Sequence, residues 1–339
     1  MKAIKVTEPF HLNLVEVPDP EIKDSHDVIL KILSGGICGS DIQIWNGTNS
    51  LATYPRIIGH EFGGVVVETG SDVHSVKPGD LAAVDPVLSC GSCYACRIGR
   101  PNVCVSLKVM GVHCDGGFSQ YVCVPESNVH KFFKDFPAPL LSLVEPYTIG
   151  AQVNSRANIS KDDCVFIMGS GPIGLTVLQT AKNLGAQVII SDLLPQRLKS
   201  ARSMGADETL LASDPLFLQR LYSFSGQDGV PVVVDTVCTP ASLEEAVSFA
   251  SPAGKVVCLG LKNQPSAIAM SEITKKELTL VGSRLSNRRF DEVIRHFEAG
   301  DYTPDQLITH QIHYSQIQEA FELLIKHPEL TLKVGLTFD

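Results

Sequence analysis

Two short motifs in the first quarter of the chain carry a cysteine, a histidine and two carboxylates. They read Cys-Gly-Ser-Asp at residues 38–41 and Gly-His-Glu at residues 59–61. A thiolate and an imidazole are ligands that zinc prefers, and a site with few protein ligands leaves room for water or substrate. Cys38 and His60 therefore predict a catalytic metal site, with packed core residues as the alternative.

Four further cysteines lie close together in one stretch, at Cys90, Cys93, Cys96 and Cys104. Four thiolates from one loop can surround a tetrahedral zinc ion and close its coordination shell. Disulfides and an iron–sulfur cluster are the alternatives, and the long last spacing argues against the cluster. We expect a structural zinc site that folds the loop and does no chemistry.

A glycine motif follows the expected buried strand at 165–168 and opens an expected helix at 172–184. Its members are Gly169, Gly171, Pro172, Ile173 and Gly174. In this context the glycines allow a tight turn, close approach of a pyrophosphate and packing of the helix on the strand. The start of the helix then faces the phosphates.

Three other residues, which follow the glycine motif in the chain, are further candidates for cofactor contacts. Asp192 ends the next expected strand, where a carboxylate binds the ribose hydroxyls and repels a 2′-phosphate, which predicts NAD rather than NADP. Arg197 could soften this preference, but a solvated helix arginine is the favoured interpretation. Gly260 follows the fourth expected strand and is placed near the nicotinamide, with an ordinary turn as the alternative.

The elements that position these residues change in character along the chain. Up to about residue 150 short alternating apolar runs and glycine turns predict a barrel-like β domain. From about residue 160 continuous apolar strands alternate with helices, which indicates a parallel sheet covered on both faces. The tail returns to mixed character, with an expected helix at 314–326. We expect one domain over 1–152 and 294–339, and an inserted domain over 153–293.

Composition limits the class of protein. The length of 339 residues favours two domains, and 44% apolar with 19% charged residues is typical of a folded chain. The net charge of −9 argues against a nucleic-acid-binding protein. The sequence shows no signal-peptide pattern and no apolar run of about 20 residues, so we expect a cytoplasmic protein without a membrane partner.

These motifs occur in the same order in zinc-dependent medium-chain alcohol dehydrogenases, which the chain resembles over essentially its whole length. Leu-Val-Glu-Pro at 143–146 and Asp-Gly-Gly-Phe-Ser at 115–119 make it most similar to the sorbitol, threonine and sugar-acid 5-dehydrogenase branch. Within that branch it is nearest to starvation-sensing proteins similar to L-gulonate and L-galactonate 5-dehydrogenases. The resemblance implies an α/β fold, with a Rossmann cofactor domain inserted in a β-rich GroES-like catalytic domain. It also implies two zinc ions per chain, NAD, and a homodimer or homotetramer.

The resemblance also implies roles for residues around the catalytic zinc. Cys38 and His60 would bind the ion. Glu61 would be a ligand or a near neighbour. Glu145 would lie beside the ion, as a ligand or through water.

Proton transfer is where the sequence departs from many members of the family. Asp41 would hold the imidazole of His60 in the required tautomer, and Ser40 would take or pass on the alcohol proton. Many relatives have a histidine where this chain has Gln43, which cannot act as an acid or a base. His113 is a conceivable substitute, with a structural or substrate-binding role as the alternatives.

The expected reaction is oxidation of a secondary alcohol of a sugar acid by NAD, with the zinc as a Lewis acid. A substrate carboxylate calls for arginine, and we expect Arg284 first, with Arg56, Arg288 and Arg289 as further candidates. Phe118 and His113 are the other expected substrate contacts. A polyol or L-threonine dehydrogenase is the alternative within enzymes, and a regulatory or binding protein that kept the fold is the alternative outside them.

Overall fold

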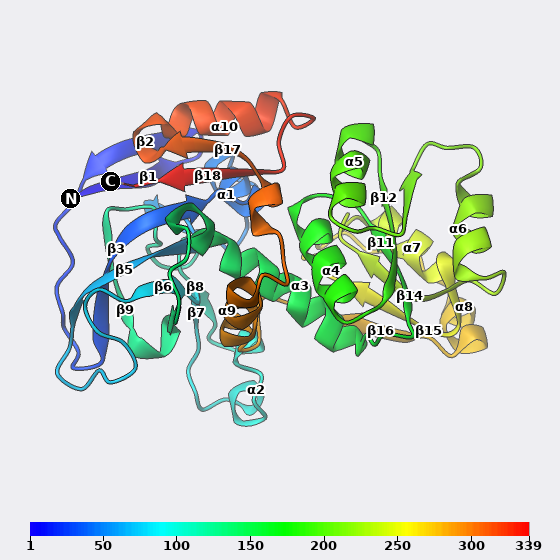
Figure 1. Ribbon diagram of the computed structural model, residues 1–339, viewed down its shortest axis with the longest axis horizontal. Coiled ribbons are helices and arrows are strands. Elements are labelled where there is room, and N and C mark those ends of the chain that lie inside the picture. The colour runs from blue at the N-terminus through cyan, green and yellow to red at the C-terminus, as the bar shows by residue number, and fades with distance from the viewer. Residues whose placement is uncertain (339) are drawn as a thin grey trace. The chain divides into compact units, whose positions relative to one another are not determined.

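The chain leaves its first compact unit and later returns to it (Figure 1). The computed structural model describes residues 1–338. Unit 1 contains Met1–Glu145, Asn287–Gly300 and the chain from Leu307 onward; unit 2 contains Pro146–Ser286 and Asp301–Gln306. The chain therefore changes units at 145/146 and 286/287, whereas the sequence placed these points at 152/153 and 293/294.

Unit 1 is built on β-sheets, as its short alternating runs predict. Its largest sheet contains β3 (Asp27–Gly36), β5 (Glu61–Thr69), β6 (Leu81–Val84), β9 (Tyr121–Pro125), β10 (Val129–Lys131), β17 (Ile308–His313) and β18 (Lys333–Thr337). The order is β10-β6-β5-β3-β18-β17, with β9 also paired to β3. Smaller sheets are formed by β1 (Lys2–Glu8), β2 (His11–Glu16) and β4 (Arg56–Ile57), and by β7 (Val87–Leu88) and β8 (Lys108–Val109).

The last strand, β18, joins this sheet beside a strand from the beginning of the chain. It runs antiparallel to β3, with Gly335 opposite Gly36. The amide of Ile37 also donates to the carbonyl of Val334 at 3.0 Å. This register places the start of β18 next to the end of β3, where the first metal-binding motif begins.

Helices in unit 1 are short, and the sequence patterns did not show the earliest ones. They are α1 (Gly39–Trp45), α2 (Tyr94–Arg97), α9 (Phe290–Ala299) and α10 (Ile317–Lys326). The expected helix at 314–326 is α10, preceded by a 3-10 turn. In Figure 1 it runs along β17 and β18. Helix α3 (Val144–Ala157) carries the chain from unit 1 into unit 2.

Unit 2 has the alternating strands and helices that the sequence predicts. Its strands are β11 (Cys164–Met168), β12 (Gln187–Asp192), β13 (Glu208–Leu211), β14 (Val230–Asp235), β15 (Ala250–Cys258) and β16 (Thr279–Gly282). They pair in parallel in the order β13-β12-β11-β14-β15-β16. This is the doubly wound Rossmann order, which confirms the predicted fold class.

Helices of unit 2 lie on the faces of this sheet (Figure 1). They are α4 (Pro172–Asn183), α5 (Pro195–Ser203), α6 (Phe217–Ser225), α7 (Pro240–Phe249) and α8 (Met270–Lys276). Phe166, Ile189 and Val233, from the three central strands, are 0% exposed. Because both faces are covered, the central strands are continuously apolar.

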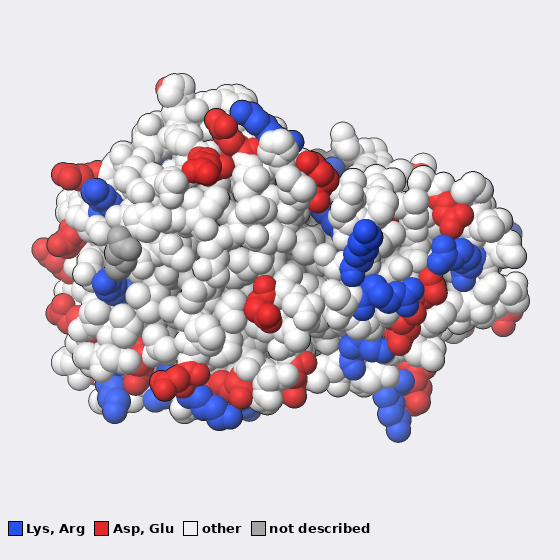
Figure 2. All heavy atoms as spheres, turned by 45° about the horizontal axis from the view of Figure 1, so that its top comes forward, with Lys and Arg blue, Asp and Glu red and all other residues white. Residues whose placement is uncertain are grey.

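The surface carries charges of both signs. On the face drawn in Figure 2, acidic and basic side chains are interspersed. None of the helices described between residues 1 and 338 combines the length and the apolar character that crossing a membrane requires.

Candidate metal and cofactor sites

The first motif folds as the start of helix α1, and this positions three polar groups around His60. Cys38 precedes the first residue of the helix, and its amide donates to Asp41 Oδ2 at 2.8 Å. The other oxygen of Asp41 lies 3.6 Å from His60 Nδ1, and Ser40 Oγ lies 3.3 Å from His60 Nε2. Burial is the largest single effect and lowers the pKa of His60. The charge and hydrogen bond of Asp41, together with Cys38, raise it by more in sum, so the pKa lies well above its usual value. The structure thus brings Asp41 and Ser40 to the two ring nitrogens of His60.

Gly59 gives the second motif its shape. Its φ of +96° belongs to the region that favours glycine, and a Cβ there would lie 2.1 Å from Phe118 Cδ1. Phe118 is 0% exposed and packs against this turn. It supports the turn that carries His60, and its expected contact with a substrate stays a prediction.

Glu61, the next residue, is paired with a lysine that the sequence did not reveal as part of the site. Lys333 Nζ lies 2.7 Å from both carboxylate oxygens of Glu61, and these side chains are only 3% and 1% exposed. Burial is the largest single effect and lowers the pKa of Lys333. Glu61, with Cys38 and Glu145, raises it by more in sum, so this pKa lies above its usual value. A lysine in an otherwise apolar closing strand is the signal that could have pointed to Lys333.

Glu145 is the second carboxylate of this region and is 6% exposed. Burial raises its pKa to about 8; the charge of His60 lowers it, Glu61 raises it and Lys333 lowers it. The structure therefore places Glu145 within electrostatic reach of the other site residues. A buried carboxyl with this pKa is stabilised as a carboxylate by any cation that enters the site.

The donor atoms of this site fit zinc. One ligand atom each from Cys38, His60 and Glu61 lie within 4.8 Å of one another. Sulfur, nitrogen and oxygen donors suit this ion, and buried carboxylates gain stability from a divalent cation. His60 and Glu61 are buried and Cys38 is half-buried.

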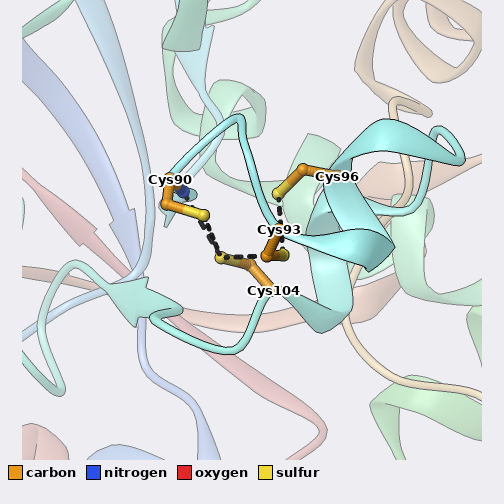
Figure 3. Close-up of side chains that lie close together, drawn as sticks. All are labelled: Cys90, Cys93, Cys96 and Cys104. Atoms are coloured by element: carbon orange, nitrogen blue, oxygen red, sulfur yellow. Dashed lines mark hydrogen bonds between the residues drawn. The ribbon is translucent and has the colours of Figure 1, made fainter.

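The four cysteines of the loop point toward one another (Figure 3). Their Sγ atoms are 3.4 Å apart for Cys90 and Cys104, 3.8 Å for Cys93 and Cys104, and 3.5 Å for Cys93 and Cys96. These separations exceed a disulfide bond of about 2.05 Å and approach the ~3.8 Å edge of a tetrahedron with ~2.3 Å metal–sulfur bonds. Backbone amides of Ser92 and Cys93 lower the pKa of Cys90 to about 6, which favours the thiolate. The geometry fits a closed metal site.

The glycine motif forms the turn between β11 and α4. Gly169 has a φ of +95°, and a Cβ on Gly174 would lie 1.9 Å from the carbonyl oxygen of Gly169. Gly171 is the N-cap of α4 and provides no side chain to cap the helix, while Pro172 and Ile173 form its first turn. The exposed helix amides can bind a phosphate.

Asp192, at the end of β12, is already oriented by the glycine turn. Its Oδ2 accepts hydrogen bonds from the amide and the hydroxyl of Ser170, at 2.8 and 3.0 Å. Arg197 Nη1 lies 3.9 Å from the position that a Cβ on Gly171 would take. The contact with Ser170, a variable position of the motif, was missed from the sequence.

The other residues expected to contact the cofactor or the substrate lie in different parts of the chain. Gly260 lies beside Cys238: a Cβ built on Gly260 would lie 3.2 Å from the Cβ of Cys238. His113 Nδ1 accepts the amide of Val109 at 3.0 Å. Arg284 lies in unit 2, whereas Arg56 lies in unit 1 and pairs with Asp115 at 3.0 Å. Among the further arginines, Arg289 pairs with Glu292 at 2.8 Å.

Comparison with known proteins gives the family. Residues 24–134 match the alcohol dehydrogenase GroES-like domain, and residues 172–299 match the zinc-binding dehydrogenase domain. The starvation-sensing protein RspB of Escherichia coli is 40% identical over 100% of this chain and 99% of its own. The L-galactonate-5-dehydrogenase of Escherichia coli is 33% identical over 95% of this chain and 94% of its own. A crystal structure of an rspB alcohol dehydrogenase from Escherichia coli, complexed with NADH, has a TM-score of 0.93 at 39% identity, covering 100% and 99% of the two chains.

The fold, the donor sets and these matches define an oxidoreductase of the zinc-type dehydrogenase class. The chain belongs to the zinc-dependent medium-chain alcohol dehydrogenase family. This confirms the predicted family, the predicted GroES-like and Rossmann architecture, and the predicted class of zinc- and NAD-dependent enzyme.

Proposed function

We propose that this chain oxidises a secondary alcohol group of a sugar acid such as L-gulonate or L-galactonate, with NAD as the hydride acceptor. The observation that carries the proposal is the group of Cys38, His60 and Glu61, whose ligand atoms lie close together, in a chain 33% identical to an L-galactonate-5-dehydrogenase. Zinc at Cys38, His60 and a carboxylate from Glu61 or Glu145 would act as a Lewis acid on the substrate hydroxyl.

The residues around His60 would then handle orientation and the proton. Asp41 Oδ1 faces His60 Nδ1 at 3.6 Å and would orient the imidazole, which would leave Nε2 for the metal. Ser40 Oγ now contacts Nε2 at 3.3 Å, so a metal on that nitrogen would free the hydroxyl to accept the substrate proton. Gln43 is exposed on α1 and cannot relay the proton further as an acid or a base.

Unit 2 would bind the cofactor. The amides at the start of α4 would bind the pyrophosphate, and Asp192 would exchange its contact with Ser170 for the ribose hydroxyls. A 2′-phosphate would meet the negative charge of Asp192, which supports NAD over NADP. Bound NAD would supply the redox chemistry as the hydride acceptor.

A polyol or L-threonine dehydrogenase is the second candidate, because two of the arginines expected to bind a substrate carboxylate already have acidic partners. Arg56 forms an ion pair with Asp115, and Arg289 forms one with Glu292. Arg284 is the candidate that the sugar-acid proposal needs.

A substrate panel separates the two candidates. The zinc-loaded protein is incubated with NAD and with hexonates, hexitols or L-threonine, and NADH formation is followed. We expect turnover of hexonates, and a loss of that turnover in Arg284→Met with turnover of any hexitol unchanged. Turnover of hexitols or L-threonine without hexonates would contradict the sugar-acid proposal and support the second candidate.

We also propose a cytoplasmic homo-oligomer. The free thiols of the cysteine loop suit a reducing compartment. Strand β16 is an edge of its sheet, and its Leu280 is 39% exposed, as expected for an edge that pairs with another copy. Sedimentation equilibrium tests this, and a monomer at micromolar concentration would contradict it.

A further inference from the structure

The carboxylate of Asp192 already accepts three hydrogen bonds within unit 2. Its Oδ1 accepts the amide of Leu194 at 2.9 Å, and its Oδ2 accepts both the amide and the hydroxyl of Ser170, at 2.8 and 3.0 Å. A carboxylate has about four acceptor sites, shared between its two oxygens. Oδ1 therefore keeps one site for a further donor, whereas both sites of Oδ2 are filled.

The two donors on Oδ2 differ in how easily they can leave it. The amide belongs to the backbone of the glycine turn, which is shaped by Gly169 at a φ of +95° and by Gly171 as the N-cap of α4. The hydroxyl of Ser170 leaves by rotation about a single side-chain bond. Ser170 is 0% exposed, so the hydrogen bond of its hydroxyl to Asp192 is shielded from water. The hydroxyl is therefore the donor that can be displaced.

The adenosine ribose of NAD needs more acceptor sites than Asp192 has open. This ribose carries two neighbouring hydroxyls, and a carboxylate at the end of this strand is where ribose hydroxyls bind. Two hydroxyls need two acceptor sites, and one of the four is unfilled. A second site opens when the Ser170 hydroxyl turns away from Oδ2, while the Ser170 amide stays in place.

We propose that the Ser170 hydroxyl is an internal competitor of the adenosine ribose, which fills an acceptor site on Asp192 and thereby limits how tightly NAD binds. The hydroxyl orients the carboxylate and gives up its hydrogen bond when the ribose enters. The inference rests on the proposed function, because it needs the ribose of NAD at Asp192. Removing the hydroxyl should tighten nucleotide binding and also destabilise the nucleotide-free protein, a combination that a purely structural role would not give.

Calorimetric titration of the zinc-loaded protein with ADP isolates the adenosine ribose, because ADP lacks the nicotinamide and its ribose. We expect Ser170→Ala to bind ADP about three- to tenfold more tightly than the wild type, since one hydrogen bond is no longer lost on binding. The analogue 2′-deoxy-ADP has one hydroxyl on this ribose and needs only the open site, so its affinity should not rise in Ser170→Ala. Thermal unfolding without nucleotide should give a lower Tm for Ser170→Ala than for the wild type.

Two controls tie the effect to the contact between Ser170 and Asp192. Thr236→Val removes a hydroxyl that donates to the carbonyls of Met168 at 2.7 Å and Gly169 at 3.2 Å in the same turn, and it should not tighten ADP binding. In an Asp192→Ala background, Ser170→Ala should change the ADP affinity by less than about twofold, because the shared acceptor is gone. An equal gain in that background would show that the effect does not pass through Asp192, which overturns the inference.

Weaker or equal ADP binding in Ser170→Ala would show that the hydroxyl orients Asp192 without competing, which overturns the inference while the proposed function stands. An equal gain for 2′-deoxy-ADP would overturn it as well. Ser170→Cys keeps the size of the side chain and donates more weakly, so it gives the same test with a smaller gain if Ser170→Ala does not fold. If Asp192→Ala leaves the affinities for ADP and NAD unchanged, both the inference and the proposed binding of the cofactor are overturned.

Discussion

At the scale of single residues, His60 is the best-defined part of the catalytic site. Asp41 lies at one ring nitrogen and Ser40 at the other, and the turn at Gly59 fixes the direction of the side chain. A metal can therefore bind Nε2 without a change in the backbone. A metal on that nitrogen would replace the contact with the Ser40 hydroxyl.

Ser40→Ala should lower kcat by about 100-fold or more, because the substrate proton loses its acceptor. Steady-state kinetics with the best substrate of the panel measures this change. Zinc content should not change, since Ser40 is not a ligand. Ser40→Thr keeps the hydroxyl and should keep most of the activity, and full activity in Ser40→Ala would contradict the proton role.

Asp192→Asn should weaken the binding of NAD and allow NADP to act as a cofactor. We expect the KM for NAD to rise about tenfold and the ratio of kcat/KM for NADP over NAD to rise by more, because the repelling charge is gone. Ser170 would still have an oxygen to donate to, so the glycine turn should keep its shape. An unchanged cofactor preference would show that another residue contacts the ribose.

At the scale of elements, local motifs predicted the parts of the sites that one segment forms. The four cysteines come from a single loop, and the glycine turn lies between one strand and one helix, so spacing was sufficient. The pair of Lys333 and Glu61 joins residues 272 positions apart. Only the register of β18 on β3 brings them together, and no pattern in the sequence sets that register. The packing of Phe118 on Gly59 is likewise a tertiary contact that no local pattern shows.

The 3-10 turn at Glu126–Asn128 illustrates a carboxylate that stabilises loop structure away from the catalytic site. Glu126 Oε1 accepts the amides of His74 at 2.8 Å and Ser75 at 2.7 Å, and the amide of Ser75 is the main reason that its pKa falls to about 2. A carboxyl whose pKa is lowered on folding stabilises the protein above its unfolded pKa of 4.5. This contribution is lost as the pH falls through about 2.

Glu126→Gln should therefore lower the free energy of unfolding at pH 7 by about 1–2 kcal/mol. The difference from wild type should shrink as the pH is lowered below about 4.5. Urea unfolding at a series of pH values measures it. Glu16→Gln, at an exposed position, is the matched control and should show no difference, whereas a pH-independent effect of Glu126→Gln would contradict the role of its charge.

At the scale of the whole molecule, each compact unit carries its own set of functional residues. Unit 1 holds both groups of metal ligands, and unit 2 holds the glycine turn and Asp192. The alternation of strands and helices predicted unit 2, and the metal-binding motifs with their family resemblance predicted unit 1. The first point at which the chain changes units lies seven residues before the expected one, inside helix α3. The second also lies seven residues early, among backbone bends at Leu285, Asn287 and Arg288 that the apolar pattern did not show.

The central claim is that Cys38 and His60 hold a catalytic zinc ion in an NAD-dependent dehydrogenase. Zinc content and NAD reduction, measured on the same preparations of wild type and Cys38→Ser, test it most directly. The account predicts two zinc ions in the wild type, one in the variant, and a loss of activity of about 1,000-fold or more, because the Lewis acid is gone while the cysteine loop keeps its ion. A Cys38→Ser protein that keeps both its full zinc content and its activity would contradict the account.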